Sequence, residues 1–69
     1  MIKIIELNKN FYNLKAVKRT AKAYKELARF SIKDTGKKIE VTMKNIDEDV
    51  KDVIEDEFCN YALSEVKDG

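Results

Sequence analysis

The spacing of apolar residues changes several times along the chain, and each change marks a predicted element. The start, MIKIIEL, is rich in Ile and predicts a strand at about residues 2–7. In the next stretch, NLKAVKRTAKAYKELA, apolar residues recur every three or four positions, which predicts an amphipathic helix with Asn13 as its N-cap. RFSIK and KIEVTMK alternate apolar and polar residues on either side of Asp34-Thr35-Gly36-Lys37, which predicts an antiparallel hairpin.

From Asn45 to about Lys67 the spacing is helical again. Asn45 and Glu48 are spaced as a capping box, and the acidic residues that follow suit the positive end of a helix dipole. A helix of this length spans about 33 Å, against about 20 Å for a strand of six residues. We therefore expect its C-terminal end to project beyond the sheet. The residues predicted to face the core are Ile46, Val50, Val53, Ile54, Phe58, Tyr61 and Ala62.

Together these elements predict one small α+β domain over residues 1–69, with the order β-α-β-β-α. A strand-helix-strand crossover is almost always right-handed, and two helices can cover one face of a three-stranded sheet. If the third strand inserts between the first two, the sheet is mixed, has the order 1-3-2, and forms a truncated ferredoxin-like fold without its last strand. We expect the core to contain Val17, Tyr24, Phe30, Ile32, Ile39, Val41, Ile54 and Phe58.

Two features of this predicted fold favour contact with another protein. The first strand lacks an outer neighbour and has Ile on both faces, and an open apolar edge invites another chain. The second helix has a second apolar stripe, which falls on its projecting end. The candidate interface residues are Ile2, Ile4, Cys59, Leu63 and Val66. A homodimer or a protein or peptide partner would cover them, although a single exposed Leu63 is also ordinary on a protein surface.

The composition excludes several kinds of chemistry. The chain has no His, one Cys and two Gly, so His-dependent catalysis, a cysteine zinc site and a Gly-rich phosphate loop are all excluded. The acids Asp52, Glu55 and Asp56 are spaced as in a solvated helix face, which we favour over a cation site. We expect no enzymatic activity, no cofactor and no metal. Without a disulfide, signal-peptide pattern or membrane-spanning run, we expect a cytoplasmic protein with no membrane contact.

The net charge of +1 conceals a strong asymmetry along the chain. Residues 1–38 contain eleven basic and three acidic residues, a net +8, whereas residues 39–69 contain three basic and ten acidic residues, a net −7. The first predicted helix has a basic stripe, which consists of Lys15, Lys18, Lys22, Lys25 and Arg29. Such a stripe can follow phosphates. However, Tyr12, Tyr24 and Phe30 fall at core or cap positions, so no surface is evident on which bases could stack.

Two stretches, FYNLKAVKRTAKAY and DEFCNYALSEV, resemble segments of the HxsD-like family, whose members are small accessory proteins of the His-Xaa-Ser peptide-maturation system. The hairpin lies between the two segments in both. The matching residues are Tyr12, Ala16, Glu57, Phe58, Asn60 and Leu63. The resemblance implies a role beside radical SAM enzymes that modify a ribosomally made peptide. It implies no catalytic residue in this chain.

Three functions therefore compete. The favoured one is a non-catalytic accessory or adaptor protein that works through protein contacts, in radical SAM-dependent peptide maturation if the resemblance holds. The alternative is a small nucleic-acid-binding module that uses the basic stripe. A third is a subunit that completes an active site in another protein.

Overall fold

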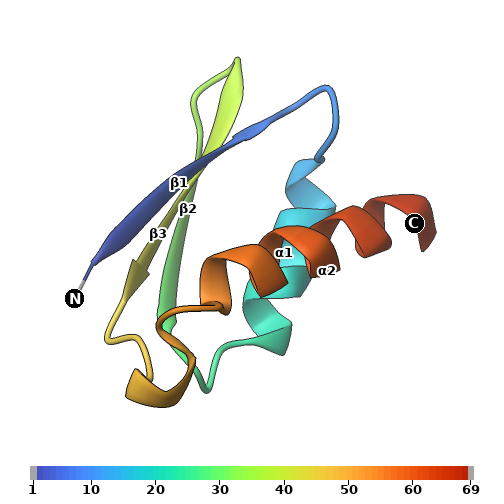
Figure 1. Ribbon diagram of the computed structural model, residues 1–69. Coiled ribbons are helices and arrows are strands. Elements are labelled where there is room, and N and C mark those ends of the chain that lie inside the picture. The colour runs from blue at the N-terminus through green and yellow to red at the C-terminus, as the bar shows by residue number, and fades with distance from the viewer. Residues whose placement is uncertain (1, 69) are drawn as a thin grey trace.

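The computed structural model describes residues 2–68 and consists of one sheet with a layer of helices on one face (Figure 1). The elements are β1 (Lys3–Asn8), α1 (Leu14–Ala23), β2 (Arg29–Asp34), β3 (Lys38–Lys44), the short 3-10 helix η1 (Glu48–Val50) and α2 (Ile54–Asp68). β3 lies between the other two strands, which gives the order β1-β3-β2. The predicted α+β class, element order and strand order are confirmed.

The sheet is antiparallel throughout, so the prediction of a mixed sheet was wrong. β3 runs antiparallel to β1, with Ile5 opposite Val41, and antiparallel to β2, with Ile32 opposite the same residue. β1 and β2 are parallel to each other, as a strand-helix-strand unit requires, but they are not neighbours. The crossover therefore leaves a gap of one strand, and the hairpin fills it with β3.

α1 begins as the sequence predicts. The backbone N–H of Ala16 donates to the side-chain oxygen of Asn13 over 2.7 Å, which satisfies one of the free amides at the start of the helix. Tyr12, just before the cap, packs against the core. On the buried face, the Thr20 hydroxyl donates to the carbonyl oxygen of Ala16 over 2.8 Å. A fully buried hydroxyl is thereby satisfied inside its own helix.

α2 begins later than predicted. Asn45 has a φ of 51°, a left-handed conformation that cannot start a helix, so the predicted Asn45 cap was wrong. The backbone N–H of Asp47 donates to the carbonyl oxygen of Leu27 over 2.7 Å, and the Asp47 side chain caps η1. The helix proper has 15 residues, or about 22 Å. Its length therefore no longer argues for a projecting end.

The core is formed where one face of the sheet meets the inner faces of both helices. Its buried apolar side chains are Ile5, Leu7, Ala16, Val17, Ala28, Ile39, Val41, Met43, Ile54, Phe58 and Ala62. Phe58 is fully buried, and its ring stacks on Phe30 with the centroids 5.2 Å apart. The predicted core is correct for Val17, Ile39, Val41, Ile54 and Phe58.

The other predicted core residues lie nearer to the surface. Tyr24, Phe30 and Ile32 pack against the core but remain half-buried. Phe30 and Ile32 are on β2, an edge strand with only one side covered, and Tyr24 is at the C-terminal end of α1. Val53 and Tyr61 were predicted to face inward and are exposed instead. Val53 precedes α2 and so lies outside its helical repeat. Tyr61 lies on a flank of α2, with its ring edge-on to Tyr24 at 5.5 Å.

Candidate interaction surface

β1 forms one edge of the sheet and has β3 as its only neighbour in the described chain. Its side chains alternate, so Ile5 and Leu7 are buried in the core while Ile4 points to the face that no helix covers. Ile2 and Ile4 are each 61% exposed. We call this strand, with Ile2 just before it, the β1 edge. It combines free backbone groups with exposed aliphatic side chains.

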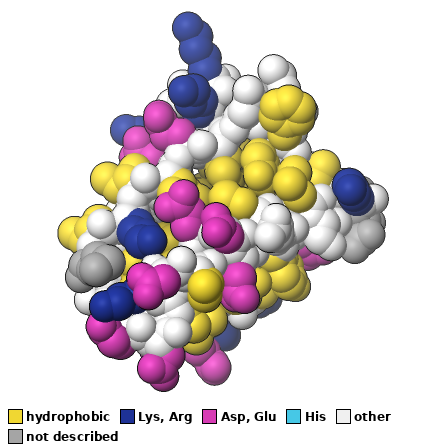
Figure 2. Space-filling view, viewed as in Figure 1, with side chains coloured by type: hydrophobic (Ala, Val, Ile, Leu, Met, Phe, Trp, Pro, Cys, Tyr) yellow, Lys and Arg dark blue, Asp and Glu magenta, His cyan; other side chains and the backbone are white. Residues whose placement is uncertain are grey.

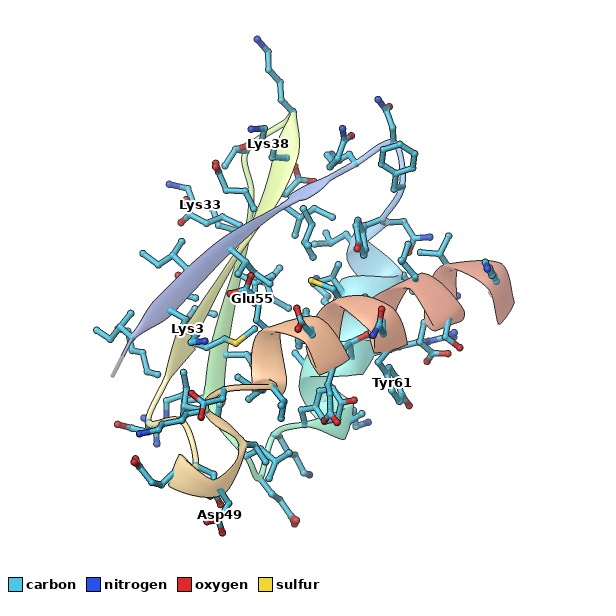
Figure 3. All side chains as sticks on the ribbon, in the orientation of Figure 1. Lys3, Lys33, Lys38, Asp49, Glu55 and Tyr61 are labelled. Carbon is cyan, nitrogen blue, oxygen red and sulfur yellow. The ribbon has the colours of Figure 1, made fainter. Side chains whose placement is uncertain are left out.

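The remaining predicted interface residues lie on one flank of α2. With 100° per residue, Cys59, Leu63 and Val66 lie on the side of α2 opposite Tyr61, whose ring contacts Tyr24 at the C-cap of α1. Figure 3 shows Tyr61 pointing away from β1. Cys59 and Val66 are half-buried and Leu63 is 37% exposed. We call these three residues the α2 flank.

Cys59 is held in a partly apolar setting at the inner part of this flank. Its thiol lies beside the Tyr12 hydroxyl, and Cys59 packs against the core. Burial raises the pKa of the Cys59 thiol, and the Glu55 carboxylate raises it further, whereas the hydrogen bond with Tyr12 lowers it. The thiol is therefore protonated near neutral pH, as expected of a packing residue rather than a reactive one.

The structure adds one residue that the sequence analysis missed. Phe11 is 65% exposed and lies in the turn after β1, where the backbone N–H groups of Phe11 and Tyr12 both donate to the Asn8 carbonyl oxygen over 3.0 Å. The sequence contained a signal for this exposure. Phe11 and Tyr12 both precede the N-cap Asn13, and only the residue next to the cap can pack under the helix, which leaves Phe11 outside. Figure 2 shows hydrophobic side chains gathered on the face formed by β1 and α2.

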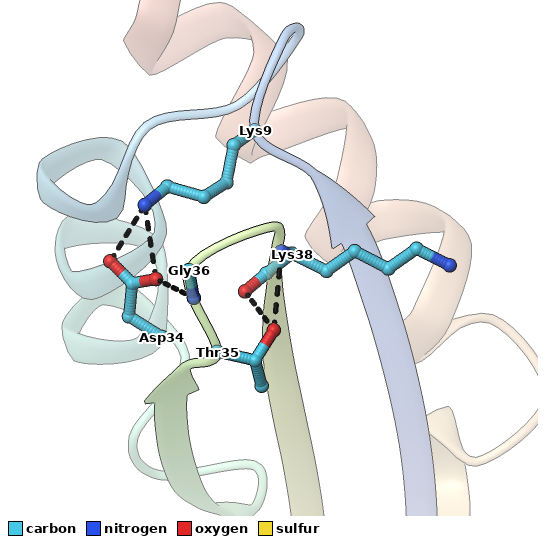
Figure 4. A network of polar contacts seen from close by, with 5 residues as sticks. All are labelled: Lys9, Asp34, Thr35, Gly36 and Lys38. Carbon is cyan, nitrogen blue, oxygen red and sulfur yellow. Dashed lines mark hydrogen bonds and ion pairs between the residues drawn. The ribbon is translucent and has the colours of Figure 1, made fainter.

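A polar clasp ties the loop after β1 to the hairpin turn (Figure 4). The Lys9 ammonium donates to both Asp34 carboxylate oxygens, over 2.9 and 3.0 Å, and the Gly36 N–H donates to the same carboxylate over 2.8 Å. These contacts hold the pKa of Asp34 below its usual range. The φ of Gly36 is 93°, as the predicted tight turn requires. The clasp thus fixes the loop that presents Phe11.

The predicted interface residues do not form one patch. Ile2 and Ile4 lie on the open face of the sheet, whereas the α2 flank belongs to the helix layer on the other face. The edge of β1 runs between the two groups. A partner that pairs with β1 would therefore meet one apolar group on each side of the new strand.

The basic stripe is exposed and has no ion pair with another side chain in the part of the chain that the structure describes. The ion pairs among residues 2–68 join Lys9 to Asp34, Lys38 to Glu6 and Lys51 to Glu48, so none involves the stripe. A shallow hollow is lined by Lys22, Lys25 and Arg29 together with the acid Glu26 and the half-buried Phe30. We call Lys15, Lys18, Arg19, Lys22, Lys25 and Arg29 the basic surface; all are exposed.

The second edge of the sheet, β2, joins this basic surface. Its outward side chains are Arg29, Ser31 and Lys33, all exposed. Figure 3 shows Lys33 pointing away from the helices. The edge of β2 is therefore bordered by positive charge on both sides, in contrast to that of β1.

Within residues 2–68, no three His, Cys, Asp or Glu side chains are grouped to hold a metal ion. None of the helices described there is long and apolar enough to cross a membrane. No protein-family model, curated protein or solved structure matches the chain.

Proposed function

We propose that this chain is a small non-catalytic accessory protein that works by binding another polypeptide at the β1 edge. The observation that carries the proposal is the exposure of Ile2 and Ile4 at a strand that, among residues 2–68, has a neighbouring strand on one side only. Edge strands of proteins that act alone usually carry charge, proline or a covering segment, because a free edge pairs with other chains.

The energetic gain supports binding at this edge. Fully burying an Ile side chain contributes about 1.5–3 kcal/mol relative to leaving it exposed. An added strand would cover much of Ile4 and also satisfy backbone groups of β1. Exposed Phe11 and Leu63 lie in the loop and on the helix flank that adjoin the same side. A partner that covers them would add aromatic and aliphatic area of the kind that dominates protein interfaces.

The finer part of the proposal is a place in peptide maturation, beside a radical SAM enzyme in the cytoplasm. It depends on the resemblance of FYNLKAVKRTAKAY and DEFCNYALSEV to the HxsD-like family. Among the residues that carry the resemblance, Leu63 belongs to the α2 flank and Tyr12 contacts Cys59. The resemblance therefore includes residues at the proposed interface as well as the core residue Phe58.

Co-purification with the proteins encoded beside this gene tests the proposal. We expect the tagged full chain to retain one of them, and we expect an Ile2→Glu, Ile4→Glu variant to lose it. Ser31→Glu is the matched control, because Ser31 lies on the other edge and is also exposed. Retention of a radical SAM enzyme would support the finer part. If no neighbouring product binds, or if the Ile variant binds as well as the parent, the proposed contact is wrong.

The basic surface supports a second candidate function, the binding of a nucleic acid. The six cations of the basic surface are exposed, form no ion pair among the described residues, and could contact phosphates. The only aromatic side chain lining the hollow between Lys22, Lys25 and Arg29 is Phe30, and its ring already stacks on Phe58. Because base stacking needs a free ring, we rank this function second.

A further inference from the structure

We infer that the β1 edge binds an extended segment of another protein in antiparallel orientation, with a basic residue opposite Glu6 and an acidic residue opposite Lys3. The inference rests on the proposed function and names the chemistry of its partner. It follows from two charged side chains of β1 that the rest of the sheet leaves without a complementary charge, and from the rows that side chains form across the sheet.

Glu6 lies at the end of a row of charges on the open face of the sheet. The row begins at Lys33 on β2, crosses Glu40 on β3 and ends at Glu6 on β1. Lys33 and Glu40 are complementary, whereas Glu40 and Glu6 are like charges in directly opposite positions, which destabilises a sheet. The Lys38 ammonium lies 4.0 Å from the Glu6 carboxylate, and both side chains are more than half exposed. A cation in the next position of the row would offset the repulsion between the two carboxylates.

Lys3 has the converse need on the helix side of the same strand. Side chains alternate along β1, so Lys3 shares the face of the buried Ile5 and is itself half-buried. Its row across the sheet contains Met43 and Phe30, which are both apolar. No carboxylate among residues 2–68 forms an ion pair with Lys3. Salt and water screen a partly buried pair less than an exposed one, so a carboxylate in the next position of this row would be stabilising.

The uncharged positions of β1 favour aliphatic residues in the added segment. On the open face the segment would pass Ile2 and Ile4, each 61% exposed. On the helix side it would run beside Ile5 and Leu7, with the α2 flank on the same side. Aliphatic side chains in these positions remove apolar surface from water. The segment that fits therefore has, read from Leu7 to Ile2, the order apolar, basic, apolar, apolar, acidic, apolar.

The end of β1 and the pairing of the sheet set the length and direction of the segment. The Asn8 carbonyl oxygen already accepts hydrogen bonds from the amides of Phe11 and Tyr12. It is not free to pair with another strand, so the added ladder extends only to Leu7. Antiparallel pairs are more stable per residue than parallel ones, and both existing strand pairs are antiparallel. In the N-to-C direction of the segment, the basic residue therefore precedes the acidic one.

Two capped synthetic peptides of equal composition test this order of charges. The first is Thr-Val-Lys-Val-Val-Glu-Val-Thr, and the second has its Lys and Glu exchanged. In antiparallel register on β1, the first peptide sets complementary charges opposite Glu6 and Lys3, whereas the second sets like charges there. Titration of the isotope-labelled full chain with monomeric peptide, followed by NMR, measures both affinities. We expect the first peptide to bind at least about fivefold more tightly at low salt, to lose part of this preference at high salt, and to shift the amide resonances of β1 rather than those of β2.

Variants of the protein show whether the two charges of β1 cause the preference. A Lys3→Glu, Glu6→Lys protein should bind the exchanged peptide more tightly than the first. Glu6→Gln changes only one exposed group, so it should keep the fold and reduce the preference without reversing it. The Ile2→Glu, Ile4→Glu protein should lose both peptides, because it disrupts the edge itself.

The outcomes separate this inference from the proposed function. Equal binding of the two peptides, or tighter binding of the exchanged peptide to the parent protein, would overturn the order of charges. If neither peptide binds while a neighbouring gene product is still captured through Ile2 and Ile4, the inferred segment is wrong and the proposed function stands. Binding of the first peptide with the expected preference, but no capture of a neighbouring product, would do the reverse.

Discussion

The two edges of the sheet differ in the way they meet solvent. β2 presents Arg29, Ser31 and Lys33 outward and borders the basic surface, whereas β1 presents Ile2 and Ile4 outward beside one acid, Glu6. Lysine and arginine on an edge strand discourage the addition of another strand, because the added chain would remove these charges from water or bring them close to other charges. The same sheet is thus protected on one side and open on the other. Exposure of backbone alone does not make an interface, and the side chains beside it decide which edge can be used.

The largest expected effect comes from removing the ring that supports the core beneath both edges. Phe58→Ala should lower the free energy of unfolding by about 3–5 kcal/mol, which is close to the whole stability of a core this small. Urea unfolding followed by circular dichroism measures it. Phe11→Ala is the control, because Phe11 is exposed and its loss should cost less than about 0.5 kcal/mol. A Phe58→Ala protein that melts like its parent would contradict the core assignment.

Any self-association of the isolated chain should depend on the β1 side and not on the β2 side. Leu63→Glu puts a charge on the α2 flank, and we expect it to weaken dimer formation about tenfold, or about 1.4 kcal/mol. Light scattering over a range of concentrations measures this. Val53→Glu is a charge-matched control at an exposed residue just before α2. A wild-type protein that stays monomeric at several hundred micromolar would rule out the dimer and leave a different partner for the β1 edge.

The basic surface gives the β2 side its own test. For single- or double-stranded DNA we expect a dissociation constant of about 100 μM or weaker at physiological salt, with tighter binding at low salt. Changing Lys18, Lys22 and Lys25 to Glu should abolish even the low-salt binding. A Lys37→Glu, Lys38→Glu variant on the hairpin turn serves as a control away from α1. Fluorescence anisotropy measures both. Micromolar binding that persists at physiological salt and is lost in the triple variant would place nucleic acid first.

The smallest expected effect concerns the clasp between Lys9 and Asp34, which joins the loop after β1 to the turn after β2. The pKa of Asp34 is lowered in the folded protein by Lys9 and the Gly36 N–H. Its contribution to stability is therefore present above the unfolded pKa, near 3.8, and is lost as the pH falls through the folded value. Melting curves of the parent and Asp34→Asn should differ slightly at neutral pH and converge under acid. A difference that stays constant down to acid would show that ionisation of Asp34 has no role.

Much of the fold was predictable because its local signals agree with one another. The alternation of apolar and polar residues in RFSIK and KIEVTMK, with Gly36 at the turn, was enough to predict the hairpin. The recurrence of apolar residues every three or four positions after Asn13 was enough to predict α1 and its N-cap. The start of α2 was not predictable. The left-handed Asn45 and the bond from Asp47 to Leu27 depend on a contact between two loops that are distant in sequence.

The candidate surface was predictable only in part. The periodicity of β1 separates Ile2 and Ile4 from Ile5 and Leu7, yet MIKIIEL has apolar residues on both faces, so the pattern could not tell which pair is buried. Packing of the helices on one side decides it. The exposure of Leu63 followed from its helical position, whereas that of Phe11 depends on the turn that the Asn8 carbonyl closes.

The central position of β3 has a consequence for the order of folding. β1 is synthesised before β2 and β3, but its only neighbour among residues 2–68 begins at Lys38, and the pair Lys3–Met43 is separated by 40 residues. The β2–β3 hairpin closes a far shorter loop, so it should form first and β1 should dock afterwards. Mutations such as Val41→Ala should then slow folding more than Ile5→Ala does, relative to their effects on stability. Until β3 pairs with it, both edges of β1 lack a partner strand, and during that interval we expect the nascent chain to be most exposed to aggregation.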